Sequence, residues 1–136
     1  MPDAVERYCS AVAAGDMAAM AEVLSPQVEL PSPVIGRALF RGRDDVVTLL
    51  GAVYGVLRDV RWEPPVGSGR QRLAVAEARV AGMRIGDAMV FELDEDGRIE
   101  RIRPHLRPLL AMAVFFLRLG PAIARQPAVL ARALRS

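Results

Sequence analysis

A change in hydrophobic periodicity near residue 60 constrains the fold of this 136-residue chain more than any other feature. Before it, apolar residues recur every three or four positions, which is typical of amphipathic helices. After it, apolar and polar residues alternate in short runs, which is typical of strands. Helices followed by strands that are joined by hairpins predict an α+β fold with an antiparallel sheet.

Three helices are predicted in the first half of the chain. The first ends at Gly15, and Asp16 caps the second. Asp44 is the predicted N-cap of the third helix. A short strand over 27–30 separates the second helix from the third. The predicted helical ranges are 3–14, 17–24 and 44–57.

Four strands and two hairpin turns are predicted in the second half. The first turn spans 81–84, and the second spans 94–97, where Gly97 suits a positive φ. A curved antiparallel sheet with helices on one face encloses a space, so the pattern also predicts a pocket. The predicted strand ranges are 60–66, 72–81, 87–93 and 98–103.

Composition is that of one globular domain, with 52% hydrophobic and 25% charged residues. The single cysteine, Cys9, cannot form an internal disulfide, and the single histidine, His105, rules out a Cys/His metal cluster. We therefore expect neither metal nor cofactor. With no secretory signal and no apolar run of roughly 20 residues, a cytoplasmic protein is expected.

Charge is divided unevenly along the chain. All 18 basic residues are arginine, and 101–136 carries seven of them but none of the 16 acids. Within that segment, 109–119 is apolar almost all round, and Gly120-Pro121 is expected to end its helix. Three arrangements of this segment are possible. It packs on its own domain or on a second subunit of a homodimer and closes the pocket or an interface, it lies on a membrane surface, or it extends freely. Scarce aromatic residues and the lack of a recognition motif argue against nucleic acid.

Five short segments follow one another along the chain: Arg7-Tyr8, Gly15-Asp16-Met17, 28–31, 41–44 and the final hairpin 91–99. In this order and spacing they resemble the nuclear-transport-factor-2-like superfamily. This superfamily includes ketosteroid isomerases, SnoaL-like polyketide cyclases and limonene-epoxide-hydrolase-like enzymes. The resemblance implies a pocket domain over 1–106, built as a cone-shaped curved antiparallel sheet wrapped by three N-terminal helices. The basic, apolar segment 107–136 is then an extra helical C-terminal extension.

The resemblance to ketosteroid isomerases can be followed residue by residue. Tyr8 matches the helix-1 tyrosine of their oxyanion hole. The position of their general base falls on Leu30, and that of their second oxyanion donor falls on Met89. Because leucine cannot carry a proton and methionine cannot donate to an oxyanion, a ketosteroid isomerase mechanism is not expected.

Asp87 and Tyr8 are the predicted catalytic residues. Side chains alternate along a strand, so Asp87 shares a face with Met89 and Phe91. If Met89 faces the pocket, as the resemblance implies, then Asp87 does too, near the rim, where apolar surroundings raise the pKa of a carboxyl. The alternatives are a solvated or arginine-paired Asp87 and an ordinary core tyrosine at position 8.

The predicted ligand-binding residues are mostly apolar or aromatic and are expected along the pocket wall. For two of them a purely structural role is an alternative: Trp62 can simply pack between sheet and helix, and His105 can cap or support the backbone. Glu77 and Arg79 are expected on the outer surface. The predicted ligand-binding residues are Val12, Leu30, Tyr54, Trp62, Met89, Phe91, His105 and Leu106.

Three functional hypotheses follow. The first is a cofactor-independent enzyme that isomerises, cyclises or hydrolyses a steroid-, polyketide- or terpenoid-like molecule by acid–base chemistry. The second is a binding module that holds such a hydrophobic ligand without chemistry. The third is a membrane-peripheral protein that uses the basic helices of 107–136.

Overall fold

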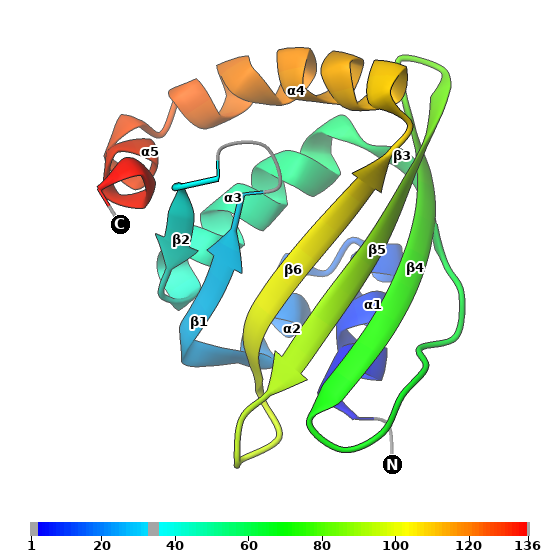
Figure 1. Ribbon diagram of the computed structural model, residues 1–136, viewed down its shortest axis with the longest axis vertical. Coiled ribbons are helices and arrows are strands. Elements are labelled where there is room, and N and C mark those ends of the chain that lie inside the picture. Colours follow the sequence, from blue (N-terminus) through cyan, green and yellow to red (C-terminus); the bar gives the residue numbers. More distant parts are fainter. Residues whose placement is uncertain (1–2, 33–35, 136) are drawn as a thin grey trace.

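The computed structural model describes residues 3–32 and 36–135 (Figure 1). Within these ranges the chain forms five helices and six strands. The helices are α1 (Ala4–Ala14), α2 (Met17–Glu22), α3 (Arg43–Val56), α4 (Leu109–Ala124) and α5 (Pro127–Leu134). The strands are β1 (Leu24–Pro31), β2 (Leu39–Arg41), β3 (Arg58–Trp62), β4 (Gln71–Val80), β5 (Met83–Leu93) and β6 (Ile99–Arg107).

The six strands form one curved sheet in the order β2-β1-β6-β5-β4-β3 (Figure 1). The predicted α+β class with a curved sheet under helices is confirmed. One pair departs from a purely antiparallel arrangement, because β1 and β6 run parallel. β1 reaches the sheet from the helical half of the chain and lies beside the last strand, where Leu24 pairs with Ile99.

The ends of the first two helices follow from local chemistry. Asp3 accepts a hydrogen bond from the Glu6 amide at 2.9 Å, and Gly15 ends α1 in the left-handed conformation, with φ of 71°. Asp16 caps α2 through the Ala19 amide at 3.0 Å, as predicted. The predicted cap of α3 was wrong, because Gly42 holds that position and Asp44 lies within the first turn.

The strand boundaries show where local pattern is misleading. β5 starts at Met83 rather than 87, and β6 continues to Arg107 rather than ending at 103. Gly86 and Pro104 interrupt the sequence pattern, but the backbone stays extended and each residue pairs across the sheet. The short strand β2, which pairs with β1, was not predicted.

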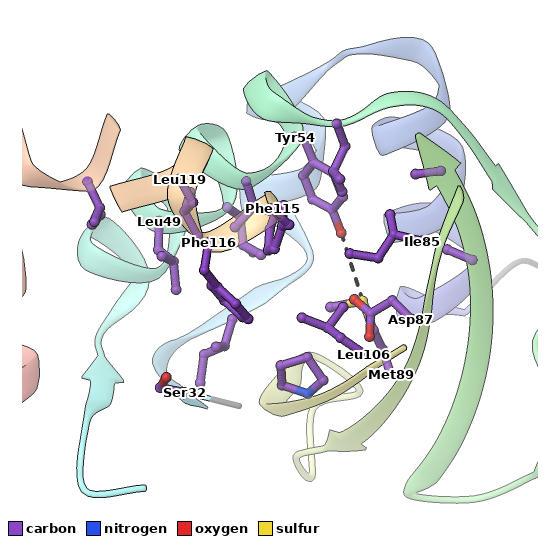
Figure 2. A pocket seen from close by; sticks show the side chains of 18 of the residues that line it. Ser32, Leu49, Tyr54, Ile85, Asp87, Met89, Leu106, Phe115, Phe116 and Leu119 are labelled. Carbon is purple, nitrogen blue, oxygen red and sulfur yellow. Dashed lines mark hydrogen bonds between the residues drawn. The ribbon is translucent and has the colours of Figure 1, made fainter. Parts of the chain in front are cut away.

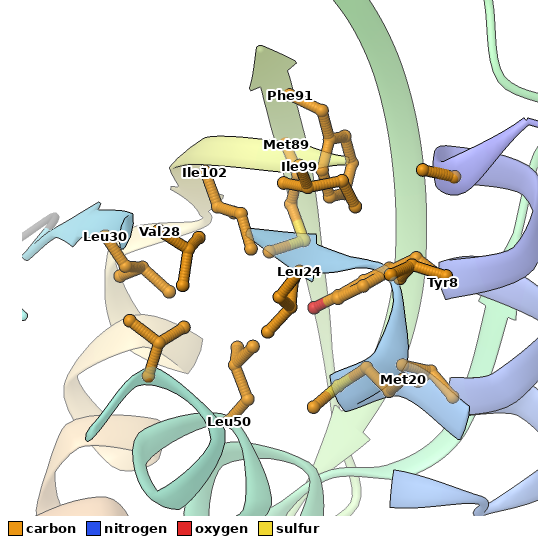
Figure 3. Packing of buried hydrophobic residues seen from close by; sticks show 14 of the residues in the cluster. Tyr8, Met20, Leu24, Val28, Leu30, Leu50, Met89, Phe91, Ile99 and Ile102 are labelled. Atoms are coloured by element: carbon orange, nitrogen blue, oxygen red, sulfur yellow. The ribbon is translucent and has the colours of Figure 1, made fainter. Parts of the chain in front are cut away.

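The two faces of the sheet have opposite character. Large apolar side chains under α1 and α2 form a fully buried core that includes Tyr8, Met20 and Phe91 (Figure 3). The other face carries alternating charges: Glu92, for example, lies 3.8 Å from Arg101 and 3.7 Å from Arg103. The helices therefore enclose only the apolar face.

The C-terminal helices pack against the rest of the chain. α4 contacts α3 and strands β4, β5 and β6, while α5 contacts β2. Arg132 on α5 binds Asp45 in the first turn of α3 through two bonds of 2.8 Å. None of the described helices alone has the length and apolar character needed to cross a membrane, although α4 and α5 meet the criterion as a pair bent by 112°.

The predicted helix break at Gly120-Pro121 was wrong. α4 continues through both residues to Ala124, and the chain turns only before Pro127. A proline inside a helix removes the hydrogen bond to the carbonyl four residues earlier, here that of Leu117. Leu117, Gly120 and Pro121 are all exposed, so the missing hydrogen bond lies on the outer side of the helix rather than in the core.

Candidate functional site

A cavity of about 280 Å³ lies on the apolar face of the sheet, below α4 and beside α3 (Figure 2). Its wall is almost wholly apolar. The helical side is built by Leu49, Val53, Phe115, Phe116, Leu119 and Ile123, and the sheet side by Leu30, Ala76, Ala78, Ile85, Met89 and Leu106.

Small side chains on β4 help to leave this space open. Ala76 and Ala78 point inward, while their neighbours Glu77 and Arg79 are exposed on the outer face, as expected. Alternation along the strand thus brings methyl groups, rather than long side chains, to the floor of the cavity. Further along the same face, Phe91 fills the corresponding space.

Asp87 is the one carboxylate among the described residues that line the cavity. It lies in the middle of β5, paired with Ala76 on one side and Leu106 on the other. Burial raises the pKa of Asp87 to about 7, an effect partly opposed by the hydrogen bond from the His105 amide and by the charge of the His105 ring. The amide nitrogen of His105 is 3.2 Å from Oδ1 of Asp87. Both protonation states of the carboxyl are therefore populated near neutral pH.

A pair of tyrosine hydroxyls lies beside this carboxyl. The oxygens of Tyr8 and Tyr54 are 2.6 Å apart, and Tyr54 lines the cavity while Tyr8 is fully buried behind it. Burial raises the pKa of Tyr8 and of Tyr54 well above the usual range, so both stay protonated at neutral pH. The Tyr54 hydroxyl also lies 3.9 Å from the sulfur of Met89 (Figure 2). Tyr54 is thus a neutral hydrogen-bond donor in the cavity wall.

Trp62 completes the aromatic corner of the site. It lines the cavity, and its ring meets that of Tyr8 edge-on at 6.0 Å between centroids. Its indole nitrogen is buried without a hydrogen-bond partner among the described residues. As the single tryptophan of the chain, Trp62 is a natural fluorescent reporter of this cavity.

The structure brings six of the predicted site residues together at the cavity. Tyr8, Val12 and Phe91 instead lie in the filled core and are not among the lining residues. Tyr8 reaches the site only through the hydroxyl of Tyr54. The six residues at the cavity are Leu30, Tyr54, Trp62, Asp87, Met89 and Leu106.

His105 lies outside this cavity, contrary to expectation. Neighbouring residues of a strand point to opposite faces, so Leu106 faces this cavity and His105 faces away from it. The His105 ring is exposed, with Nδ1 3.2 Å from the carbonyl oxygen of Ala88. It borders a second hollow that shares Ser32, Pro104 and Leu106 with the first.

α4 forms the roof of the cavity, which agrees with the interpretation that 107–136 packs on its own domain and closes the pocket. None of its residues was among the predicted site residues. Phe115, Phe116, Leu119 and Ile123 of α4 close the space above the sheet (Figure 2). Their signal was present in the all-round apolar character of 109–119, which is typical of a helix with more than one partner. The described residues hold no group of three or more His, Cys, Asp or Glu side chains that could bind a metal ion.

Comparison with known proteins identifies the family. The SnoaL-like domain model matches residues 5–102. The chain belongs to the SnoaL-like domain family. The match covers the first three helices and most of the sheet, and α4 and α5 lie beyond it. No curated protein matches the chain.

Solved structures share the fold of this SnoaL-like chain. An uncharacterised bacterial protein with a cystatin-like fold from Silicibacter pomeroyi is 20% identical, with a TM-score of 0.87 over 96% of this chain and 93% of its own. A steroid delta-isomerase from Pseudomonas aeruginosa is 22% identical, with a TM-score of 0.82 over 92% of each chain. A polyketide cyclase described as putative, from Sinorhizobium meliloti, is 21% identical, with a TM-score of 0.63 over 77% of this chain and 95% of its own. At these identities the likeness establishes the fold, which hosts many activities.

Proposed function

We propose that the cavity binds a small, largely apolar molecule with one polar group, and that Asp87 exchanges a proton with it. The observation that carries the proposal is a single carboxylate with a pKa of about 7 in an otherwise apolar wall. Acid–base catalysis is most efficient when the pKa of the catalytic group lies near the working pH. Steroid-, polyketide- and terpenoid-like compounds have the required chemistry.

The reaction class supported by this arrangement is a proton shift next to a carbonyl. The Asp87 carboxylate takes a proton from the carbon beside the carbonyl, and the released electron pair moves onto the carbonyl oxygen. That oxygen accepts a hydrogen bond from the neutral Tyr54 hydroxyl, which is held by Tyr8 at 2.6 Å. Asp87 then returns the proton to another carbon of the conjugated enolate, which isomerises the molecule. Alternatively, the enolate carbon attacks a second carbonyl and closes a ring, and the oxygen of that carbonyl takes the proton back from Asp87.

Cavity size and wall chemistry restrict the ligand. Ligand pockets commonly enclose roughly 300–1,000 Å³, so about 280 Å³ suits a compact molecule. A charged ligand would lose its hydration against a wall of leucine, phenylalanine and alanine. The preferred substrate is therefore neutral, compact and ketone-bearing.

Asp87→Asn tests the proposal, because asparagine keeps the size of the side chain but cannot accept the proton. Binding of cyclic ketones, steroid fragments and aromatic polyketide analogues is followed by Trp62 fluorescence. Exchange of ketone α-protons with deuterated water is followed by NMR. We expect the substitution to slow catalysed exchange by roughly 100-fold or more while binding persists.

Glu77→Gln is the matched control, since it removes a carboxylate from the exposed face of the neighbouring strand. It should leave both readouts unchanged. If Asp87→Asn catalysed exchange of ketone α-protons as fast as the wild type, the acid–base role of Asp87 would be refuted. No change of Trp62 fluorescence with any ketone would refute ligand binding.

A non-catalytic binding module is the second candidate. Leu30 and Met89, which occupy the positions of two catalytic carboxylates in the resemblance to ketosteroid isomerases, both line the cavity. A wild-type protein that binds ketones but does not accelerate their α-proton exchange would establish this second function.

A further inference from the structure

The outward face of α4 is apolar along most of its length. Leu109, Leu110 and Leu117 are 81%, 68% and 76% exposed, and Ala113 between them is exposed as well. These positions lie on the side of the helix opposite to the buried Phe115. Soluble proteins seldom gather several large apolar side chains on one exposed face without a partner.

Positive charge borders this face. Arg118 and Arg125 are exposed beside it, and Arg107 precedes the helix. The whole segment 101–136 contains seven arginines and no acidic residue. An apolar strip edged with guanidinium groups is complementary to the surface of a bilayer that contains anionic lipids, where apolar side chains enter the acyl boundary and arginines meet phosphates.

We propose that the outward face of α4, formed by Leu109, Leu110, Ala113 and Leu117, docks on anionic lipid bilayers. α4 runs along an outer edge of the molecule, so nothing in the described chain shields it from a flat surface (Figure 1). From Leu109 to Leu117 the helix rises about 12 Å, so the apolar strip is about 12 Å long and lies parallel to such a surface.

A second copy of the chain fits this face less well. Two-fold pairing of α4 with α4 would bring Arg118 and Arg125 of both copies toward one interface. No acidic residue within 101–136 is available to pair with them. Like charges that face each other across a contact oppose association, whereas anionic lipid phosphates neutralise the same arginines.

The docking face and the cavity roof are two sides of one helix, α4. The opposite side of α4 supplies Phe115, Phe116 and Leu119 to the cavity. Docking would therefore hold the cavity directly beneath the membrane surface, one helix diameter away. This inference does not depend on the proposed proton transfer, since it rests on the outer side chains alone.

Sedimentation of the full-length protein with vesicles tests the proposal. We expect the wild type to sediment with vesicles of phosphatidylcholine and phosphatidylserine at low salt, and much less with phosphatidylcholine alone. The double variant Leu110→Ser/Leu117→Ser should lose at least 10-fold in partitioning. Arg118→Gln and Arg125→Gln should each lose about fivefold on anionic vesicles only.

Val66→Ser is the matched control, because Val66 is another exposed apolar residue, 57% accessible, that lies away from α4. It should sediment like the wild type. Circular dichroism and Trp62 emission confirm that each variant is folded. Wild-type protein that stays in the supernatant with anionic vesicles at low salt would overturn the proposal. So would a vesicle-independent dimer that the double leucine variant converts to a monomer.

Discussion

The apolar face of the sheet has two ends that are filled differently. The filled end lies under α1 and α2, and the cavity end lies under α4. Under α1 and α2, Tyr8, Met20 and Phe91 are fully buried and belong to one cluster of packed apolar residues (Figure 3). Under α4, the floor contributed by β4 is made by Ala76 and Ala78, and a cavity remains. The difference shows that side-chain volume, rather than the backbone, decides which end stabilises the fold and which end can hold a ligand.

The largest effect is expected at the filled end. Phe91→Ala should lower the free energy of unfolding by about 3–5 kcal/mol, because Phe91 is fully buried against the ring of Tyr8 at 5.1 Å. Phe116→Ala, in the wall of the existing cavity, should cost only about 1–2 kcal/mol. Urea denaturation measures both. Equal losses would contradict the division between the two ends.

The cavity end should show its own dependence of stability on pH. The pKa of Asp87 is raised from 3.8 to about 7 in the folded state, so folding favours the protonated form. The contribution of Asp87 to the free energy of unfolding is therefore fully present below pH 4 and is lost as the pH rises through 7. Asp87→Asn should match the wild type near pH 4 and exceed its unfolding free energy by roughly 2–4 kcal/mol at pH 8.

Urea titrations at pH 4, 6 and 8 measure this difference. Glu77→Gln, on the outer face of β4, provides the baseline for loss of a carboxylate. A difference between Asp87→Asn and the wild type that does not change with pH would show that Asp87 is solvated rather than buried.

The boundary between the first two helices was predictable from the sequence because it depends on neighbouring residues, whereas the cap of α3 and the end of α4 were predicted wrongly. Gly15 and Asp16 act on atoms within one turn, so their pattern is sufficient. Strand alternation likewise placed Asp87 and Met89 on one face, and both line the cavity.

The site was less predictable because it depends on packing between distant segments. The apolar character of 109–119 indicates a buried helix, but no local pattern tells which residues of α4 line the cavity or that Tyr54 lies between Tyr8 and the open space. Gly120-Pro121 carries a strong local signal for a helix end, but α4 continues through it along its exposed side. The position of His105 could have been corrected by alternation with Leu106, since the two cannot share a face.

Alanines on one strand permit a direct comparison of the two ends. Ala74 and Ala78 point to the same side of β4, but Ala74 belongs to the filled core and Ala78 to the cavity wall. Ala74→Leu should lower the free energy of unfolding by about 1–3 kcal/mol through overpacking.

Ala78→Leu should change the same free energy by less than about 1 kcal/mol, because the added carbons enter empty space. It should also weaken binding of any ligand that fills the cavity. Urea denaturation and Trp62 fluorescence measure the two quantities. A larger loss of stability in Ala78→Leu than in Ala74→Leu would reverse the assignment of the ends.

The smallest effect is expected where α5 joins α3. Arg132→Gln removes the paired bonds of 2.8 Å to Asp45, and solvent weakens that ion pair. We expect almost unchanged global stability, faster amide exchange in α5, and a rise in the pKa of Asp45, which Arg132 now lowers. NMR measures both, with Arg125→Gln as a charge-matched control. Unchanged exchange in α5 would show that other contacts hold this helix.

The parallel pairing of β1 with β6 has a consequence for how the protein is made. Leu24 leaves the ribosome early, but its partner Ile99 is synthesised only after five of the six strands. Until then β1 has only the short β2 beside it, and its other edge can pair with foreign strands. Folding is therefore expected to finish late in translation, since contacts between remote segments form slowly. A chain that stops before residue 99 would leave the nascent sheet incomplete and prone to aggregate.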